Sequence, residues 1–231
     1  MKHIAIVLSA GKGKRMGSAI PKQYLTVGEK PIINYTLDTF EQSFMDEIIV
    51  VVAPGDEDTF ARQILTLGNY QKVTRIVAGG KERYDSVYAG LCAIAKEDQD
   101  AYVYIHDGAR ACIRPNVLEA GRDAALQYGN AVAGMPVKDT IKIVDETQTV
   151  VDTPDRKTLW LIQTPQIFKV SSIRLAYEAM YQQDEEQRKK VTDDAMVMET
   201  FGQEAVHIFE ASYENIKITT PDDLEWMKRT M

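Results

Sequence analysis

"HIAIVLSAGKGKRMGSAIPKQYL", residues 3–25, joins an apolar segment to a basic loop that contains three glycines. Residues 3–9 are apolar on both alternating faces, which is typical of a parallel strand covered by helices on each side of a sheet. In open α/β sheets, ligands bind at the carboxyl ends of the strands. The loop after this strand is therefore a candidate ligand site.

The loop carries four fixed positive charges and no acid, in a chain whose formal net charge is −7. Residues 1–28 hold five Lys or Arg and no Asp or Glu, so the positive charge is concentrated there. Gly11, Gly13 and Gly17 permit the backbone to approach a phosphate closely and to present successive N–H groups. The cations favour a bound triphosphate, the alternative being a solvated basic turn; they are Lys12, Lys14, Arg15 and Lys22.

Several classes of protein are disfavoured by the same stretch. Both the dinucleotide fingerprint and the Walker A loop would need glycine at position 16, where the chain has Met16. A nicotinamide-dependent redox protein would also need an acid after the second strand, which ends in Ala53-Pro54-Gly55. The acidic total argues against general nucleic-acid binding.

Repeated alternation of strand and helix patterns predicts a doubly wound, mostly parallel α/β sheet in one domain over residues 1–231. Helical stripes are marked by apolar residues at intervals of three and four, and Pro115 and Gly129 bound one helix. The further strands are predicted at 47–53, 72–78, 101–106 and 130–137. The helical stripes are Ile33, Leu37 and Phe40; Tyr84, Val87, Leu91 and Ile94; and Ile173, Ala176, Tyr177 and Met180.

Residues 138–156 interrupt this alternation. They form two alternating segments around the polar tip 145–148, a pattern that predicts a β-hairpin too polar for the core. Two interpretations remain open. The hairpin is either an edge element of the sheet or an arm that reaches onto a partner subunit.

A second candidate site follows the strand at 101–106. Asp107 there could hold Mg²⁺, and Arg110 could bind a phosphate with two hydrogen bonds. The alternative for Asp107 is a hydrogen bond within its own turn. His106 is interpreted as a hydrogen-bonded strand-end residue, because three scattered histidines support neither a zinc site nor a catalytic triad. Lys217 is predicted to lie in a short strand before the last helix.

No apolar run approaches the roughly 18 residues that span a bilayer, and the N-terminal pattern is not that of a secretory signal. Cys92 and Cys112 form no metal-binding motif. We therefore expect the protein in the reducing cytoplasm.

Taken together, the motifs resemble those of the 2-C-methyl-D-erythritol 4-phosphate cytidylyltransferases, in the same order and over essentially the whole chain. They are "LSAGKGKRMG…PKQYL" (8–25), "GGKERYDSVYAGL" (79–91), "IHDGAR" (105–110), "VKDTIK" (137–142), "TPDRKTLWLIQTPQIF" (153–168), "VTDDA" (191–195) and "ENIKITTPDDL" (214–224). The resemblance implies transfer of CMP from CTP to a sugar-alcohol phosphate with release of pyrophosphate, in the non-mevalonate route to isoprenoid precursors.

The resemblance also implies roles for individual residues. Arg15 and Lys22 would hold the CTP phosphates, Lys217 would approach the same phosphorus, and Asp107, with Arg110 beside it, would hold Mg²⁺ or orient the substrate. The nucleotide-binding positions would be Ser9, Ala10, Gly11, Gly13, Gly80, Ser86 and Asp107. The substrate-binding positions would be Asp107, Arg110, Thr164 and Thr192, joined by Thr140 and Arg156 on the arm, which in the family reach the neighbouring subunit of a homodimer.

Two departures from the family pattern, Ala111 in place of proline and Ser9 in place of alanine, remove no charged group. The nearest alternative is a ribitol 5-phosphate cytidylyltransferase, which shares several of these motifs but looks less like "DSVYAGL" and "HDGAR". A nucleotide-binding module without catalysis is a further alternative.

Overall fold

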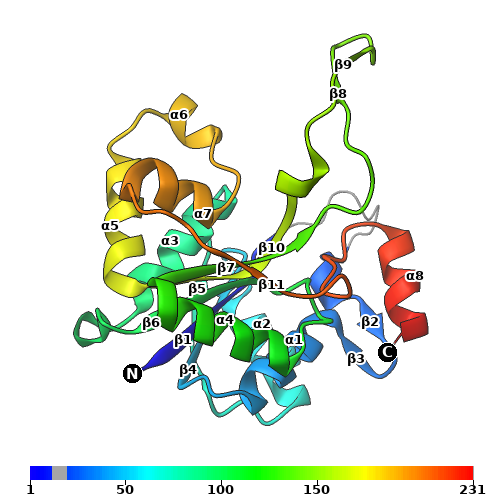
Figure 1. Ribbon diagram of the computed structural model, residues 1–231. Helices are drawn as coiled ribbons and strands as arrows, with labels where there is room; N and C mark the ends of the chain where they lie inside the picture. Colours follow the sequence, from blue (N-terminus) through cyan, green and yellow to red (C-terminus); the bar gives the residue numbers. More distant parts are fainter. Residues whose placement is uncertain (12–19, 231) are drawn as a thin grey trace.

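A computed structural model describes residues 1–11 and 20–230 of the chain. At its centre is a seven-stranded sheet with the strand order β11–β7–β10–β6–β1–β4–β5 (Figure 1). The strands of this sheet are β1 (His3–Ser9), β4 (Glu47–Val52), β5 (Val73–Ala78), β6 (Tyr102–Asp107), β7 (Asn130–Pro136), β10 (Trp160–Lys169) and β11 (Ile208–Glu210). All five strands expected from the sequence are present, with ends within one residue of the expected ones.

The sheet is mostly parallel, as the sequence predicts. β1 pairs in parallel with β4 and β6, whereas β10 runs antiparallel to both β6 and β7. β10 and β11 were not among the expected strands. The pairing of β10 with β7 is irregular, because its register shifts between Ile162 and Gln166.

Helices cover both faces of the sheet, and each face has its own apolar cluster. Ile4 and Ile6 of β1 pack on one face, and Ala5 and Val7 of the same strand pack on the other. This explains why the strand is apolar at consecutive positions. One face is covered by α3 (Arg83–Ala93), α5 (Val170–Tyr181) and α7 (Asp194–Val197), and the other by α1 (Ile32–Gln42), α2 (Glu57–Gln63) and α4 (Pro115–Tyr128).

The helix ends follow the local signals. α4 begins with Pro115 in its first turn and ends at Gly129, which has a φ of +88° that favours glycine. The chain also forms the helices α6 (Glu185–Lys189) and α8 (Pro221–Thr230), a π-helical turn at Met198–Gly202, and the small ladder of β2 (Thr26–Val27) and β3 (Lys30–Pro31). α8 packs beside β2, where Met227 and Val27 share a third apolar cluster. No helix among residues 1–11 and 20–230 is long and apolar enough to cross a membrane.

The expected hairpin is confirmed. β8 (Ile143–Val144) and β9 (Val150–Asp152) pair antiparallel at the end of an arm that projects from the body of the molecule (Figure 1). At the tip, the Asp145 carboxylate accepts hydrogen bonds from the N–H groups of Thr147 and Thr149. A polar tip of this kind stabilises the turn without a hydrophobic core around it.

The prediction of a short strand around Lys217 was wrong. Residues 211–219 form no strand, although Ile218 N–H donates to the carbonyl of Ala109. The segment is held by side chains instead of a strand ladder, because Asn215 Nδ2 donates to Thr164 O and Arg110 Nη1 donates to Asn215 O. α8 then begins at Pro221, as expected.

Candidate active site

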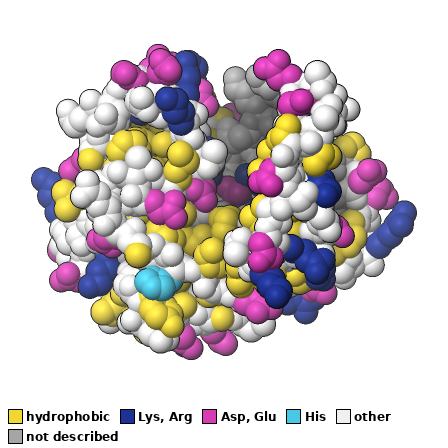
Figure 2. All heavy atoms as spheres, turned by 45° about the horizontal axis from the view of Figure 1, so that its top comes forward, with side chains coloured by type: hydrophobic (Ala, Val, Ile, Leu, Met, Phe, Trp, Pro, Cys, Tyr) yellow, Lys and Arg dark blue, Asp and Glu magenta, His cyan; other side chains and the backbone are white. Residues whose placement is uncertain are grey.

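A cavity of about 310 Å³ opens where the carboxyl ends of β1 and β6 meet. Figure 2 views the molecule with the arm brought forward and shows this face hollowed between the arm and the helices opposite it. The lining residues come from distant parts of the sequence: Leu8, Ala10, Gly11, Lys22, Gln23, Gly80, Lys81, Glu82, Arg83, Ser86, Asp107, Ala109, Lys217 and Thr219. The sheet thus assembles the site at the edge that the sequence indicated.

Lys22 and Lys217 both line this cavity. Lys22 lies in a single 3₁₀ turn, Lys22–Tyr24, which is held to the end of β1 by the side chain of Gln23. The buried Gln23 amide donates to the carbonyl oxygens of Ser9 at 2.6 Å and Gly11 at 2.9 Å. Gln23 was missed by sequence analysis, because nothing in its spacing signals these backbone partners.

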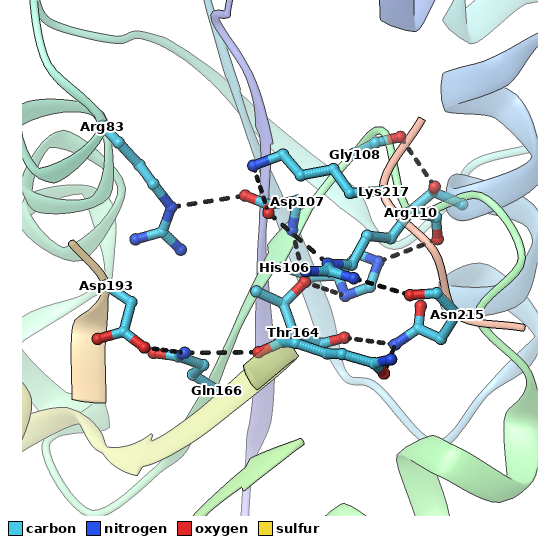
Figure 3. Close-up of polar contacts among 12 residues, drawn as sticks. Arg83, His106, Asp107, Gly108, Arg110, Thr164, Gln166, Asp193, Asn215 and Lys217 are labelled. Atoms are coloured by element: carbon cyan, nitrogen blue, oxygen red, sulfur yellow. Dashed lines mark hydrogen bonds and ion pairs between the residues drawn. The ribbon is translucent and has the colours of Figure 1, made fainter. Parts of the chain in front are cut away.

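Asp107 is the electrostatic centre of the cavity. Lys217 Nζ lies 2.8 Å from its Oδ2, Arg110 Nε lies 3.8 Å from Oδ2, and Arg83 Nε lies 3.5 Å from Oδ1 (Figure 3). Burial alone would raise the pKa of Asp107, but the three cations outweigh it and hold the pKa well below its ordinary value. The Asp107 carboxylate is therefore ionised, and it is surrounded by an excess of positive charge.

Arg83 was also missed by sequence analysis. It lies in the first turn of α3, where a positive charge opposes the helix dipole, so an arginine there indicates an acidic partner. That partner is the fully buried Asp194, whose two carboxylate oxygens accept from Arg83 at 3.0 and 2.7 Å. The Tyr177 hydroxyl donates to the same carboxylate at 2.6 Å. The guanidinium is thus fixed between Asp194 and the cavity.

Arg110 sits behind the lining of the cavity. Its Nη1 donates to the carbonyl oxygen of Asn215 at 2.8 Å, which ties the turn after β6 to the segment that carries Lys217. Its Nε makes no hydrogen bond within the described residues. His106, directly before Asp107, is fully buried, and burial lowers the pKa of its imidazole to about 3. His106 is therefore neutral at physiological pH and is unsuited to act as a solvent-exposed base.

The expected nucleotide-binding residues separate into two groups. Ala10, Gly11, Gly80 and Ser86 line the cavity, and the Gly80 N–H donates to Ser86 Oγ at 3.2 Å. Ser9 is not among the described lining residues, because it is buried and its hydroxyl donates to the Tyr24 hydroxyl at 3.4 Å.

The expected substrate-binding residues lie at three separate places. Thr164 is buried behind Asp107, and its Oγ1 accepts from the Asp107 N–H at 3.1 Å. Thr192 is exposed and lines a smaller cavity of about 110 Å³, which shares Glu82 and Arg83 with the larger one. Thr140 and Arg156 are exposed near the base of the arm and line neither cavity.

Within residues 1–11 and 20–230, no group of three or more His, Cys, Asp or Glu is placed to hold a metal ion. Mg²⁺ is commonly bound by only one or two carboxylates together with phosphate oxygens of the substrate. The ionised Asp107, which faces the cavity, is compatible with such a site.

The sequence model of 2-C-methyl-D-erythritol 4-phosphate cytidylyltransferase (IspD) matches residues 3–230. The chain belongs to this family. A member from Lachnospira eligens is 48% identical over 224 residues, which cover 96% of each chain. A member from Clostridium botulinum (strain Langeland) is 45% identical over 223 residues, covering 96% of this chain and 94% of that one.

Solved structures of the cytidylyltransferase family share the fold. 4-Diphosphocytidyl-2C-methyl-D-erythritol synthase from Anaerococcus prevotii superposes with a TM-score of 0.83 at 32% identity, over 99% of this chain and 97% of the other. The Francisella tularensis 2-C-methyl-D-erythritol 4-phosphate cytidylyltransferase superposes with a TM-score of 0.80 at 28% identity, and both chains are covered completely.

Two positions that the cytidylyltransferase resemblance implied, Arg15 and Gly13, lie outside the described residues. Of the charged groups that it implied within them, Lys22, Asp107 and Lys217 meet at one cavity.

Proposed function

We propose that the protein transfers CMP from CTP to 2-C-methyl-D-erythritol 4-phosphate, giving 4-diphosphocytidyl-2-C-methyl-D-erythritol and pyrophosphate. In this role it would serve the non-mevalonate synthesis of isoprenoid precursors. The observation that carries the proposal is the meeting of Lys22 and Lys217, from opposite ends of the chain, in the cavity that contains Asp107. Membership of the cytidylyltransferase family supports it.

The chemistry requires little of the protein beyond positioning and charge. An anionic phosphate oxygen of the sugar phosphate attacks the α-phosphorus of CTP and forms the new P–O bond. The bond from the α-phosphorus to the oxygen that bridges it to the β-phosphorus breaks, and that oxygen leaves on pyrophosphate with the electron pair. No proton is transferred, so a general base is unnecessary. Cations that neutralise the developing negative charge supply the catalysis.

We assign this neutralisation to Lys22 and Lys217, with Arg15 of the basic loop as the third cation. Asp107 would hold Mg²⁺ against the phosphates or orient the sugar phosphate. Arg110 would support Asp107 in this role. Removal of divalent cations with EDTA is expected to abolish turnover, and added Mg²⁺ is expected to restore it. Turnover that is unaffected by EDTA would contradict a role for the metal.

Recognition of cytosine is assigned to the side of the cavity that Ala10, Gly80 and Ser86 line. These residues are small or present backbone groups, which suits a flat base that must approach the chain closely. Ser9, as a buried neighbour, would support this wall through the backbone.

We further propose a homodimer formed through the arm. The arm exposes several aliphatic side chains that no other residue among 1–11 and 20–230 covers; they are Ile141, Ile143, Val144, Val150 and Val151. A second copy would bury them, and it would bring Thr140 and Arg156 to the partner's site.

We also assign the protein to the cytoplasm. Cys92, which is exposed, and the buried Cys112 are both free thiols, which is compatible with a reducing compartment.

A pyrophosphate-release assay tests the function directly. Purified protein is offered each of CTP, UTP, ATP and GTP with either 2-C-methyl-D-erythritol 4-phosphate or ribitol 5-phosphate. Release with CTP and the methylerythritol substrate is the expected result. Activity with ribitol 5-phosphate alone would replace the assignment with the alternative cytidylyltransferase, and binding of CTP without turnover would favour a non-catalytic module.

A further inference from the structure

The imidazole of His106 is fully buried directly before Asp107, and the reaction described above gives it no part. Its two ring nitrogens both have polar partners (Figure 3). Nδ1 lies 3.1 Å from Thr164 Oγ1, and Nε2 lies 3.4 Å from the carbonyl oxygen of Arg110. The Phe40 ring packs against the imidazole with the ring centroids 5.1 Å apart.

These partners fix the tautomer. The carbonyl oxygen of Arg110 can only accept, so the ring proton belongs on Nε2, and Nδ1 is then an acceptor. The Thr164 hydroxyl has a single proton, which it donates to Nδ1. Its oxygen remains able to accept the Asp107 N–H, which lies 3.1 Å away. This assignment satisfies every donor and acceptor in the set.

We propose that His106 is a positioning residue that holds the turn of residues 107–110 at both of its ends. At the first end it acts through Thr164 on the backbone of Asp107, and at the second it bonds the carbonyl of Arg110 directly. The inference rests on the proposed function, since it assigns a role in placing Asp107 within that site.

Thr164 acquires a different role from the one that the family resemblance implied. Its hydroxyl is buried and is committed to His106 and to the Asp107 N–H. It is also absent from the described residues that line the cavities. The Thr164 hydroxyl therefore supports the placement of Asp107.

The same turn also supports Lys217. Ile218 N–H donates to the Ala109 carbonyl at 2.9 Å, and the Arg110 guanidinium donates to the Asn215 carbonyl at 2.8 Å. The turn is also held at Gly108, whose N–H donates to the Leu8 carbonyl and whose carbonyl accepts from Thr36 Oγ1. Loss of both His106 contacts is therefore expected to shift Asp107 and Lys217 together without unfolding the turn. Because a misplacement of about 1 Å can cost on the order of 10²-fold in rate, the effect is expected in kcat. The KM for CTP should change by less than about threefold, because the wall around Ala10, Gly80 and Ser86 stays in place.

Three substitutions of His106 separate positioning from packing. In His106→Asn the carboxamide oxygen stands near the Nδ1 position and can accept from Thr164. In His106→Gln the amide nitrogen can reach the Arg110 carbonyl, and His106→Leu keeps only the volume. We expect kcat to fall by about 10²-fold for Leu, by less for Gln and by less than about tenfold for Asn. Thermal melting of each variant shows whether it is folded, so that a lower kcat can be distinguished from a loss of folded protein.

Thr164→Val and Thr164→Ser provide the matched pair at the other end. Thr164→Ser keeps the hydroxyl and is expected to retain most of kcat. Thr164→Val is expected to resemble His106→Gln, because both lose the connection at Nδ1 while the bond to the Arg110 carbonyl can remain. The double variant His106→Leu/Thr164→Val should cost no more than His106→Leu alone, because that substitution already removes the connection that the two residues share. Equal kcat for His106→Asn and His106→Leu, or additive losses in the double variant, would overturn the proposal.

A readout without turnover keeps this inference separate from the proposed function. The ¹⁵N chemical shifts of the His106 ring are expected to show a protonated Nε2 and an unprotonated Nδ1. Hydrogen exchange at the Asp107 amide is expected to accelerate in Thr164→Val. The opposite tautomer, or unchanged exchange at Asp107, would refute the positioning role even in an active enzyme. Absence of activity in the wild-type protein would instead refute the proposed function.

Discussion

Lys217 and Asp107 are brought together from distant parts of the chain, with Lys217 Nζ 2.8 Å from the Asp107 carboxylate. Asp107 ends the central strand β6, and Lys217 lies in the irregular segment before α8. Arg83 and Arg110 approach the same carboxylate, so three cations surround one acid. Asp194 pairs with Arg83, so the group as a whole holds three cations and two acids. The positive charge that remains suits a polyanionic substrate.

Lys217→Ala and Lys22→Ala are each expected to lower kcat by about 10²–10³-fold, which is the usual loss for one preorganised electrostatic group. The assay is pyrophosphate release from CTP with 2-C-methyl-D-erythritol 4-phosphate. Lys228→Ala is the matched control, because Lys228 is exposed on α8 and pairs with Glu225 outside the cavity. Near-wild-type turnover of either cavity variant would reject the assignment of these lysines.

Arg83→Ala is expected to destabilise the fold by about 3–5 kcal/mol, because it leaves the fully buried Asp194 carboxylate without its cation. Arg83→Lys retains the charge but not the pair of hydrogen bonds, so its loss should be smaller. Urea unfolding measures the free energy of unfolding of both variants and of the double variant Arg83→Ala/Asp194→Asn, in which the buried charge is also removed. If the double variant is no more stable than Arg83→Ala, the buried charge is not the cause.

Gln23→Ala removes the amide that binds the carbonyl oxygens of Ser9 and Gly11. The turn that carries Lys22 is then held less firmly at the cavity. We expect the KM for CTP to rise by about tenfold, which corresponds to about 1.4 kcal/mol of lost binding. Gln23→Glu cannot donate and should show the same direction. Unchanged steady-state kinetics in both variants would show that Gln23 does not position the turn.

The pH dependence of stability should contain a contribution from Glu47. Burial alone would raise the pKa of Glu47, but hydrogen bonds from Lys2 and Thr74 outweigh it, and the pKa lies below its ordinary value. The ionised carboxylate therefore stabilises the fold above about pH 4.5, and this stability is lost as the pH falls through the lowered pKa. Glu47→Gln should reduce the free energy of unfolding at pH 7 more than at pH 3. Equal losses at both values would contradict the pairing.

If the arm forms the dimer interface, a charged residue placed on it should dissociate the dimer. Val151 is 60% exposed in β9, and Val151→Asp places a charge among the aliphatic side chains of the arm. Sedimentation velocity is expected to show a dimer for the wild type and a monomer for the variant, with the melting of the body nearly unchanged. A wild-type monomer at micromolar concentration would contradict the dimer.

The parts of the fold that the sequence predicted share a physical origin. β1, β4 and β6 are apolar at consecutive positions because helices cover both faces of the sheet, and this pattern is visible in the sequence itself. β10 is different. Its centre contains Gln163, Thr164 and Gln166, which are buried but hydrogen-bonded, so its composition indicates no strand.

The site was predicted only as far as single positions carried a chemical signal. Lys22, Asp107 and Lys217 were identified as charged groups without a local structural role or by the family resemblance. Arg83 and Gln23 were not, because their partners, the Asp194 carboxylate and two backbone carbonyls, are defined only by the folded chain. The strand expected at Lys217 failed because side-chain hydrogen bonds replace the ladder there.

The buried Asn215 has a consequence for how the protein is made. Its side chain bonds Gln163 and Thr164, and its carbonyl accepts from Arg110, so the segment that carries Lys217 is attached to strands synthesised much earlier. A nascent chain on the ribosome can assemble most of the sheet before this segment emerges. Translation that stops short of Asn215 would therefore yield a polypeptide that lacks both Lys217 and the part of the third apolar cluster contributed by Ile218 and Met227.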